Sequence, residues 1–355
     1  MSEHVGSNIP PKIVLFQGGH GGRSLRQGLR AYLESQEVAQ VTVVGPTTDS
    51  GGSAGRLKDD HKTMAVTDVF QAMSDFALNP HDAKLLSQRF IVGNGGSNGL
   101  NGHRAINLMF AGAVEVFEND PIKALEYLTN KFPLIPNVRV YPVTSEWDLE
   151  LIYSLEGGGI IPREHLADDR QSGPAIKGLE LSNNKAQILE PVKEAITLAD
   201  MVVFGPGTLH GSICSQLLIQ GVPQALQKSR AINILFSNIF NQQGQTDGYD
   251  LFKYGEVIER LVGRSLDYYT YFTQKVNGSF YPEVVSFYQE YGQDLVRFDP
   301  SHPMASKVRS YDLVTKSPGL SKSGKEVELL RHTPEPSAAA LMDIWRVHTR
   351  SVAKS

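Results

Sequence analysis

Three glycine-rich segments of the chain each follow a short apolar run that predicts a β-strand. They read GGHGG (residues 18–22), DSGGSAGR (residues 49–56) and GPGTLHGS (residues 205–212). Where a strand passes into a helix, the helix N-terminus leaves backbone N–H groups unpaired, and glycine lets a phosphate approach them closely. Three such turns on one chain predict a site for a phosphorylated ligand, and the expected class is a nucleotide.

The first glycine turn matches neither of the two common phosphate-binding patterns. Its glycines do not fall at G-x-G-x-x-G, and the second predicted strand ends in Gly45 and Pro46 rather than in a ribose-binding acid. No Gly-Lys-Ser/Thr follows it, so it is not a Walker A loop. These departures count against an NAD-dependent oxidoreductase. The alternative for this segment taken alone is a tight turn that binds nothing.

The second glycine segment adds an acid and an arginine. Asp49 ends the second predicted strand, where open α/β sheets bind their ligands, and Arg56 could hold a phosphate. Asp68 lies within a predicted helix among apolar residues, where a carboxylate is costly unless it faces a cleft. Asp49 and Asp68 are therefore the candidate catalytic residues and the candidate Mg²⁺ ligands. The alternative is that Asp49 only caps a turn.

The third glycine segment and a later polar loop complete the candidate site. Thr208 is a good helix N-cap, and amides and hydroxyls in the loop after residue 237 suit recognition of a base, ribose or sugar. The alternative for that loop is a polar hairpin connection. The predicted nucleotide- and phosphate-binding residues are Gly18, Gly19, His20, Gly21, Gly22, Ser50, Gly51, Gly52, Ser53, Arg56, His103, Asn107, Gly205, Pro206, Gly207, Thr208, Asn238, Gln243, Gln245, Thr246, Asp247 and Tyr249.

The elements that must position these residues alternate between strand and helix. Strands are predicted at 12–17, 40–46, 199–207 and 231–238, and helices at 23–35, 60–77, 209–219, 249–262 and 336–348. This pattern predicts an α/β fold, a Rossmann-like parallel sheet in three α/β/α layers. We expect a flexible leader at 1–11, one domain at 12–330 with a strand-rich insert at about 135–190, and a C-terminal helix and tail at 331–355.

Composition excludes several classes of protein. The 355 residues carry a net charge of -4, which offers no electrostatic basis for binding nucleic acid. The single cysteine, Cys214, excludes an internal disulfide framework and a cysteine-rich zinc site, and its context predicts a core thiol. No apolar run is long enough to cross a membrane, and the N-terminus lacks the pattern of a signal peptide. We expect a cytoplasmic protein without membrane insertion.

Taken together, the motifs resemble the CofD/YvcK superfamily. These are the three glycine segments, VYPVT, and a loop of the form S-N-x-x-x-Q-x-G-Q-T-D-G-Y, in order between residues 12 and 249. This superfamily includes 2-phospho-L-lactate transferases and bacterial gluconeogenesis-factor-like proteins. The chain departs from the family pattern at His20 and Gly21, at Ser50 in place of a second acid, at Phe70 and Gln71, at Ile106 and at Gln245.

The resemblance implies one of two functions. The gluconeogenesis-factor branch, which the second segment resembles more, implies binding of a nucleotide-sugar such as UDP-N-acetylglucosamine and regulation of carbon and cell-wall precursor metabolism. The transferase branch implies Mg²⁺-dependent transfer from a guanosine nucleotide donor to a deazaflavin-type acceptor. We expect a homodimer. The segment after Tyr268 is rich in Phe and Tyr, which predicts core or dimer contacts.

Overall fold

The computed structural model describes residues 10–90, 99–273, 281–320 and 326–353. Seven parallel strands form the central sheet in the order β10-β9-β8-β7-β1-β2-β3. Their bounds are β1 Lys12–Phe16, β2 Gln40–Gly45, β3 Val138–Pro142, β7 Met201–Phe204, β8 Ile232–Phe236, β9 Tyr268–Phe272 and β10 Val308–Tyr311. The predicted α/β fold with a parallel sheet is confirmed.

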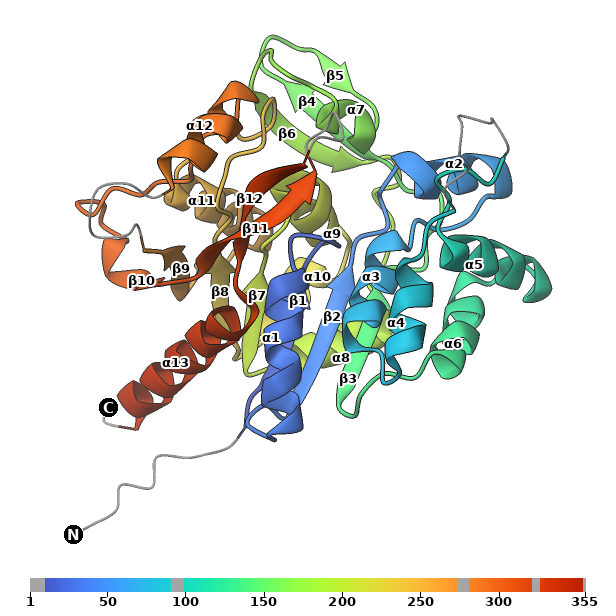
Figure 1. Cartoon of the computed structure of the whole chain (residues 1–355), viewed down its shortest axis with the longest axis horizontal. Coiled ribbons are helices and arrows are strands. Elements are labelled where there is room, and N and C mark those ends of the chain that lie inside the picture. The colour runs from blue at the N-terminus through green and yellow to red at the C-terminus, as the bar shows by residue number, and fades with distance from the viewer. Residues whose placement is uncertain (1–9, 91–98, 274–280, 321–325, 354–355) are drawn as a thin grey trace.

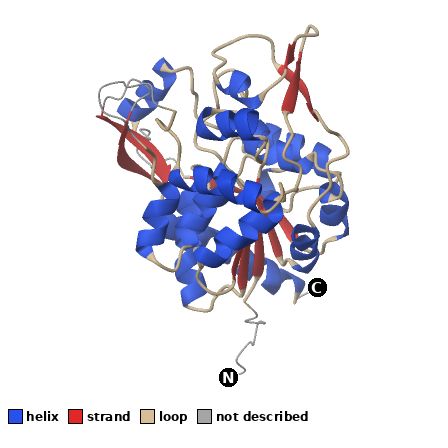
Figure 2. Cartoon of the chain, turned by 90° about the vertical axis from the view of Figure 1, so that its right-hand side faces the viewer, coloured by secondary structure: helices blue, strands red, loops and turns tan. Residues whose placement is uncertain are grey.

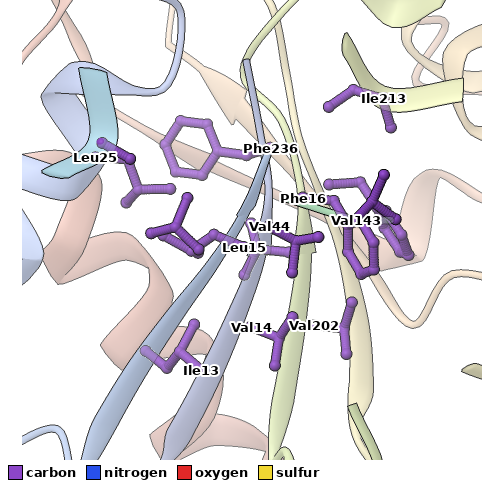
Figure 3. Packing of buried hydrophobic residues seen from close by; sticks show 14 of the residues in the cluster. Ile13, Val14, Leu15, Phe16, Leu25, Val44, Val143, Val202, Ile213 and Phe236 are labelled. Carbon is purple, nitrogen blue, oxygen red and sulfur yellow. The ribbon is translucent and has the colours of Figure 1, made fainter. Parts of the chain in front are cut away.

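The central strands are mostly apolar because helices cover both faces of the sheet. Every residue of β7 and β8 is buried. In Figure 3, Leu25 of a helix on one face and Ile213 of a helix on the other pack against the same strands. The rings of Phe16 and Phe204 stack on neighbouring strands, with centroids 5.6 Å apart.

Helices α1 (Arg23–Glu34), α3 (Thr67–Phe76) and α13 (Pro334–Val352) cover one face of the sheet (Figure 1). The other face carries α8 (Glu190–Leu198), α10 (Val222–Lys228) and α11 (Leu251–Val262). Figure 2 shows the strands from the side, between helices. The remaining helices are α2 (Gly52–His61), α4 (Pro80–Ser87), α5 (Ala105–Val116), α6 (Pro121–Lys131), α7 (Glu164–Asp168), α9 (Ser215–Leu217) and α12 (Pro282–Glu290), with a π-helical turn η2 (Leu209–Cys214) and a 3-10 turn η3 (Ala305–Lys307).

Two small antiparallel sheets flank the carboxyl edge of the central sheet. One has the order β5-β4-β6, formed by β4 (Leu151–Leu155), β5 (Ile160–Ile161) and β6 (Ile176–Leu181). The other is the hairpin of β11 (Val314–Leu320) and β12 (Glu326–His332). In Figure 1 the green three-stranded sheet and the red hairpin lie near the same end of the molecule.

The structure corrects three local predictions. The helix expected at 60–77 is two helices, α2 and α3, separated at Lys62, whose φ is 50°. No Gly or Pro marks this break, and apolar residues continue across it, so the helical pattern appeared unbroken. The segment at 49–56 is not a turn throughout, because α2 begins at Gly52. The strand β3, which fell within the expected strand-rich insert, pairs with β2 in the central sheet.

Other expectations lie partly outside the described residues. Residues 1–9 of the expected leader lie outside the described residues. Across the segments that are described, no helix is both long and apolar enough to cross a membrane.

Candidate functional site

A cavity of about 700 Å³ lies at the carboxyl edge of the central sheet. Chain order reverses between β1 and β7, because β2 and β3 extend the sheet on one side of β1 and β7 to β10 on the other. Open α/β sheets bind ligands in the crevice at such a point. Of the predicted residues, the cavity is lined by Gly18, Gly19, His20, Gly21, Asp49, Asp68, Pro206, Gly207, Thr208, Asn238 and Gln243.

Two of the glycine turns lie back to back on the cavity wall. A Cβ on Gly21 would lie 2.8 Å from the Cα of Gly207, and one on Gly207 would lie 3.2 Å from the backbone N of Gly18. The Asn238 side chain holds Gly207 on both sides: its Oδ1 accepts from the Gly207 N–H at 3.2 Å, and its Nδ2 donates to the Gly207 carbonyl at 2.8 Å. Glycine is therefore required here by close approach of the backbones, and Asn238 fixes the second turn.

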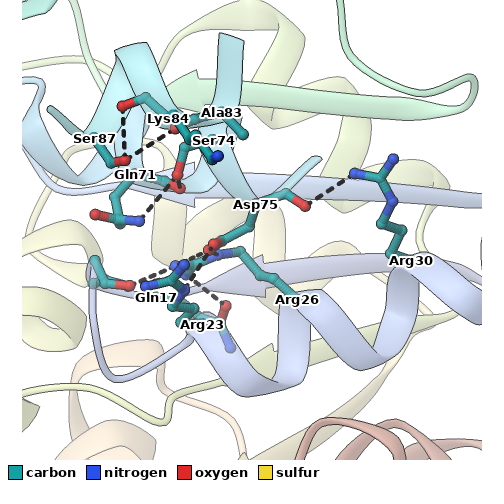
Figure 4. A network of polar contacts seen from close by, with 12 residues as sticks. Gln17, Arg23, Arg26, Arg30, Gln71, Ser74, Asp75, Ala83, Lys84 and Ser87 are labelled. Carbon is teal, nitrogen blue, oxygen red and sulfur yellow. Dashed lines mark hydrogen bonds and ion pairs between the residues drawn. The ribbon is translucent and has the colours of Figure 1, made fainter. Parts of the chain in front are cut away.

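A buried arginine fixes the first turn from below (Figure 4). Arg26 is fully buried on α1, and its guanidinium pairs with Asp75 of α3 at 2.8 Å. It also donates to the carbonyls of Gly18, at 3.1 Å, and Gly19. These carbonyls point into the protein, and the Gly19 N–H lies on the side of Asp68 and the cavity.

The π-helical turn η2 follows the second turn directly. Thr208 caps it, because the Thr208 Oγ1 accepts from the Ser212 N–H at 3.0 Å and contacts the Ser212 Oγ at 2.8 Å. The Thr208 carbonyl accepts from both Ser212 and Ile213. The π-helical turn is wider than an α-helical turn, and Ser212 lines the cavity beside Gly18. A Cβ on Gly18 would lie 2.2 Å from the Ser212 Oγ. Thr208 is thus an N-cap, as the sequence predicts.

Four carboxylates line the acidic side of the cavity: Asp49, Asp68, Glu164 and Asp168. Burial, followed by repulsion from Asp49, raises the pKa of Asp68 to about 7. Burial and then the charges of Asp49, Asp168 and Asp68 raise the pKa of Glu164 to about 9. Burial also raises the pKa of Asp49 and of Asp168. This wall therefore holds protons at neutral pH unless a cation enters.

The carboxylates supply the hard oxygen donors that Mg²⁺ prefers. Mg²⁺ is usually held by one or two carboxylates together with phosphate oxygens and water, and Asp49 and Asp68 fit that donor set. Within residues 10–90, 99–273, 281–320 and 326–353, however, no three His, Cys, Asp or Glu side chains converge as a ready-made metal site. A Mg²⁺ ion held by Asp49 and Asp68 would therefore need further ligands from outside these side chains.

The glycine turn at His20 also experiences positive charge. Partial burial lowers the pKa of His20, and the charges of Arg104, Arg23, Arg331 and Arg89 lower it further. Arg104 is buried and donates to the Gln71 Oε1 at 2.9 Å, whereas its Nε has no hydrogen-bond partner among the described residues. Arginines around a glycine turn favour an anion at this end.

The other predicted residues do not line the cavity. Some of these residues connect α2 to α5 and to the loop before it. The Ser53 Oγ lies 3.0 Å from the His103 Nδ1 and 3.3 Å from the Asn107 Nδ2. Arg56 donates to the Asn101 carbonyl. The Ser50 Oγ contacts the His165 Nδ1 of α7 at 3.0 Å. Gly22, Gly51, Gly52 and Gly205 lie in or beside the turns without reaching the cavity.

The polar loop after β8 contributes mainly through its first half. Gln243 lines the cavity, whereas Gln245 donates to the Asp168 Oδ1 at 2.6 Å and so positions that carboxylate. Thr246 accepts from the Gln242 N–H at 2.8 Å, and Asp247 from the Gly244 N–H at 2.8 Å. Tyr249 packs edge-on against His210, with ring centroids 6.3 Å apart. These four residues shape the loop.

Sequence reasoning missed three walls of the cavity. The helix α7 brings Glu164 and Asp168, four residues apart, from the small three-stranded sheet. The hairpin brings Arg331 and His332, and α12 brings Phe287, Tyr288 and Tyr291. The sequence EHLAD did carry a signal for the first wall, because its two acids are four residues apart and so share one face of a helix. The other two walls depend on where the hairpin and α12 fold, which no local pattern indicates.

Comparisons with known proteins indicate the family of the chain. The family model of "2-phospho-L-lactate transferase CofD" matches residues 13–314. A putative gluconeogenesis factor of Thermotoga maritima is 31% identical over 81% of this chain and 86% of its own length. One from Deinococcus radiodurans is 29% identical over 94% of this chain, which spans 66% of that protein.

Solved structures show the same fold. The crystal structure of a UPF0052-family protein from Bacillus halodurans superposes with a TM-score of 0.79 at 25% identity, covering 94% of this chain and 99% of that one. Both the sheet topology and the sequence match extend over most of the chain. The chain therefore belongs to the CofD family and is similar over most of its length to proteins named gluconeogenesis factors.

Proposed function

We propose that this protein binds a nucleotide or nucleotide-sugar of the UDP-sugar type and has a regulatory role in carbon and cell-wall precursor metabolism. One observation carries the binding proposal: two glycine turns meet at the β1–β7 crevice, beside a His20 whose pKa is lowered by burial and by the charges of four arginines. The anionic phosphates would lie at this end. The gluconeogenesis-factor names of the relatives support the regulatory role.

Titration calorimetry with UDP-glucose, UDP-N-acetylglucosamine, GDP and NAD, each with and without Mg²⁺, tests the proposal. We expect binding of a UDP-sugar. A bound ligand also stabilises the fold by RT ln(1 + [L]/Kd), about 2.7 kcal/mol at a hundredfold excess over Kd, so thermal unfolding gives a second measurement. Binding of NAD alone, or of none of these, would refute the proposal.

The acidic wall favours a second candidate function, Mg²⁺-dependent transfer of a phospho-group from a guanosine nucleotide to a deazaflavin-type acceptor. A carboxylate with a pKa of about 7, as in Asp68, is well suited to take a proton from an acceptor hydroxyl at neutral pH. Alternatively, Asp49 and Asp68 would hold the metal, which would neutralise charge on the phosphates; a metal-bound Asp68 would not be the base. GDP binding that requires Mg²⁺ and is lost in both Asp49→Asn and Asp68→Asn would favour this function, and metal-independent binding would favour the regulatory one.

A homodimer and a cytoplasmic location also remain proposals. Light scattering on the purified chain measures its oligomeric state directly, and a monomer at micromolar concentration would refute the dimer.

A further inference from the structure

The Phe- and Tyr-rich segment near the C-terminus does not form only core contacts. Three aromatic residues of α12 and its C-terminal end, Phe287, Tyr288 and Tyr291, line the same cavity as the glycine turns, together with Phe240 from the loop after β8. We call these four residues the aromatic wall. Aromatic side chains at a cavity surface are costly to leave in contact with water, so their placement suggests a ligand with an apolar or planar part.

The aromatic wall is held rigidly. The rings of Phe240 and Tyr288 stack with centroids 3.8 Å apart and planes 13° from parallel. The backbone of Leu330 in β12 bonds the Tyr288 hydroxyl. Backbone pairing anchors the chain after α12 to the polar loop, because the Asn241 N–H donates to the Asp294 carbonyl at 2.7 Å. Tyr288 is thus the fixed base of the wall.

The other two rings are free to meet a ligand. Phe287 and Tyr291 have ring centroids 4.9 Å apart at 56°, and Tyr291 is 37% exposed. Two amide side chains, Gln243 and Gln293, line the cavity beside them. Gln243 packs on the last turn of α12, where a Cβ on Gly292 would lie 2.4 Å from its Nε2. Because the two ring planes are 56° apart, a planar heteroaromatic ring can stack on one of them and meet the other at an angle, with the amide donors and acceptors at its edge.

We propose that the aromatic wall is a stacking subsite for the planar heteroaromatic ring of the ligand, with Phe287 and Tyr291 as its contact surface. The inference rests on the proposed function, in which the phosphates lie at the glycine turns of the same cavity. The ring is the nucleobase of the bound nucleotide. The ring of a deazaflavin-type acceptor has the same chemistry, and the experiment separates the two.

The test compares Phe287→Ala with a matched control. Phe117 and Tyr127 form a pair of similar geometry, 5.5 Å apart at 53°, and do not line the cavity, so Phe117→Ala removes an equivalent ring elsewhere. Calorimetry measures UDP-glucose, GDP, inorganic pyrophosphate and riboflavin with each protein. We expect Phe287→Ala to weaken nucleotide binding about 5- to 100-fold, because stacking on an aromatic side chain contributes that much per base. Pyrophosphate affinity should stay unchanged.

The possible outcomes distinguish failure of the aromatic subsite from failure of the proposed function. Phe287→Tyr should keep nucleotide affinity, Phe117→Ala should have no effect, and Tyr291→Ala should act as Phe287→Ala does. A loss confined to riboflavin would assign the same subsite to the acceptor ring. Equal loss of pyrophosphate and nucleotide in Phe287→Ala, or no change in any ring-containing ligand, would overturn the subsite alone. Pyrophosphate binding without any nucleotide or riboflavin binding to the intact protein would overturn both proposals.

Discussion

At the scale of single residues, the shape of the cavity wall depends on glycines, which have no Cβ atom. The turns after β1 and β7 approach so closely that Gly21 and Gly207 leave no room for a methyl group between them. Arg26 and Asn238 then fix the two turns from opposite sides through their carbonyl and amide groups. The cavity wall at these turns is therefore shaped by Arg26, which lies beneath it, and by Asn238, which also lines the cavity.

Gly21→Ala should weaken nucleotide binding at least tenfold while the sheet remains folded. The new Cβ would lie 2.8 Å from the Cα of Gly207 and 3.1 Å from the Pro206 carbonyl, so the two turns must move apart. Calorimetry measures the affinity, and far-UV circular dichroism checks the fold. Gly99→Ala is the control, because its Cβ would meet no described atom within 4 Å. Unchanged affinity in Gly21→Ala would show that the turns do not hold the ligand.

At the scale of elements, α1 and α13 meet at one glycine. A Cβ on Gly28 of α1 would lie 2.0 Å from the Pro334 carbonyl and 3.0 Å from the Ala338 Cβ of α13. Arg346 of α13 pairs with Glu37 farther along this contact, at 2.9 Å. The C-terminal helix thus packs on the same α1 whose Arg26 supports the first turn.

Gly28→Ala should lower the free energy of unfolding by about 1–3 kcal/mol, because the two helices must separate to admit the methyl group. The matched control is Gly112→Ala in α5, where the Cβ would meet no described atom within 4 Å. That variant should be stabilised by about 0.4–1 kcal/mol, since alanine favours an exposed helix interior. Denaturant unfolding measures both. A Gly28→Ala variant that is stabilised, as Gly112→Ala should be, would contradict the close packing of α1 on α13.

The sequence was sufficient to predict which segments are helices and which are strands. It was less informative about where each element ends and which neighbour it pairs with. The runs KIVLF and INILF are mostly apolar, which is typical of strands buried on both faces, and the structure confirms both as strands. The break at Lys62 carries no Gly or Pro, so one helix was expected where two occur. Of the site, the glycine turns, Asp49 and Asp68 were predictable because strand ends converge at one edge. Glu164, Arg331 and Phe287 were not, because their place depends on how distant segments dock.

At the scale of the whole molecule, the buried ionisable groups give stability an unusual dependence on pH. Burial lowers the pKa of His210 and of His332 to about 4, so their protonation opposes folding below their ordinary value of 6.5. Glu164 acts in the opposite direction, because its pKa in the folded protein, about 9, lies above its ordinary value of 4.5. The folded state keeps a proton that the unfolded state has released, which lowers stability as pH rises.

Between about pH 4.5 and 6.5 the two histidines raise the free energy of unfolding with pH while Glu164 and Asp68 lower it, so the free energy of unfolding of the ligand-free protein should change little over this lower limb. It should fall between pH 7 and 9, where Glu164 still holds its proton only in the folded state. Urea unfolding across this range measures both limbs. Glu164→Gln should flatten the upper limb, whereas Glu156→Gln, at an exposed turn of the small sheet, should leave it unchanged. A wild-type curve that stays level from pH 7 to 9 would contradict the buried acid.

The walls of the cavity differ in how tightly they are bound to the sheet. The glycine turns are continuations of β1 and β7, and so they cannot change without disturbing the core. The small sheet with α7, and the hairpin with α12, are attached through loops and reach the same cavity from outside it. These outer walls can therefore be altered without cutting into the sheet. We expect α7 and α12 exchanged between relatives to change which ligand is bound while the sheet still folds.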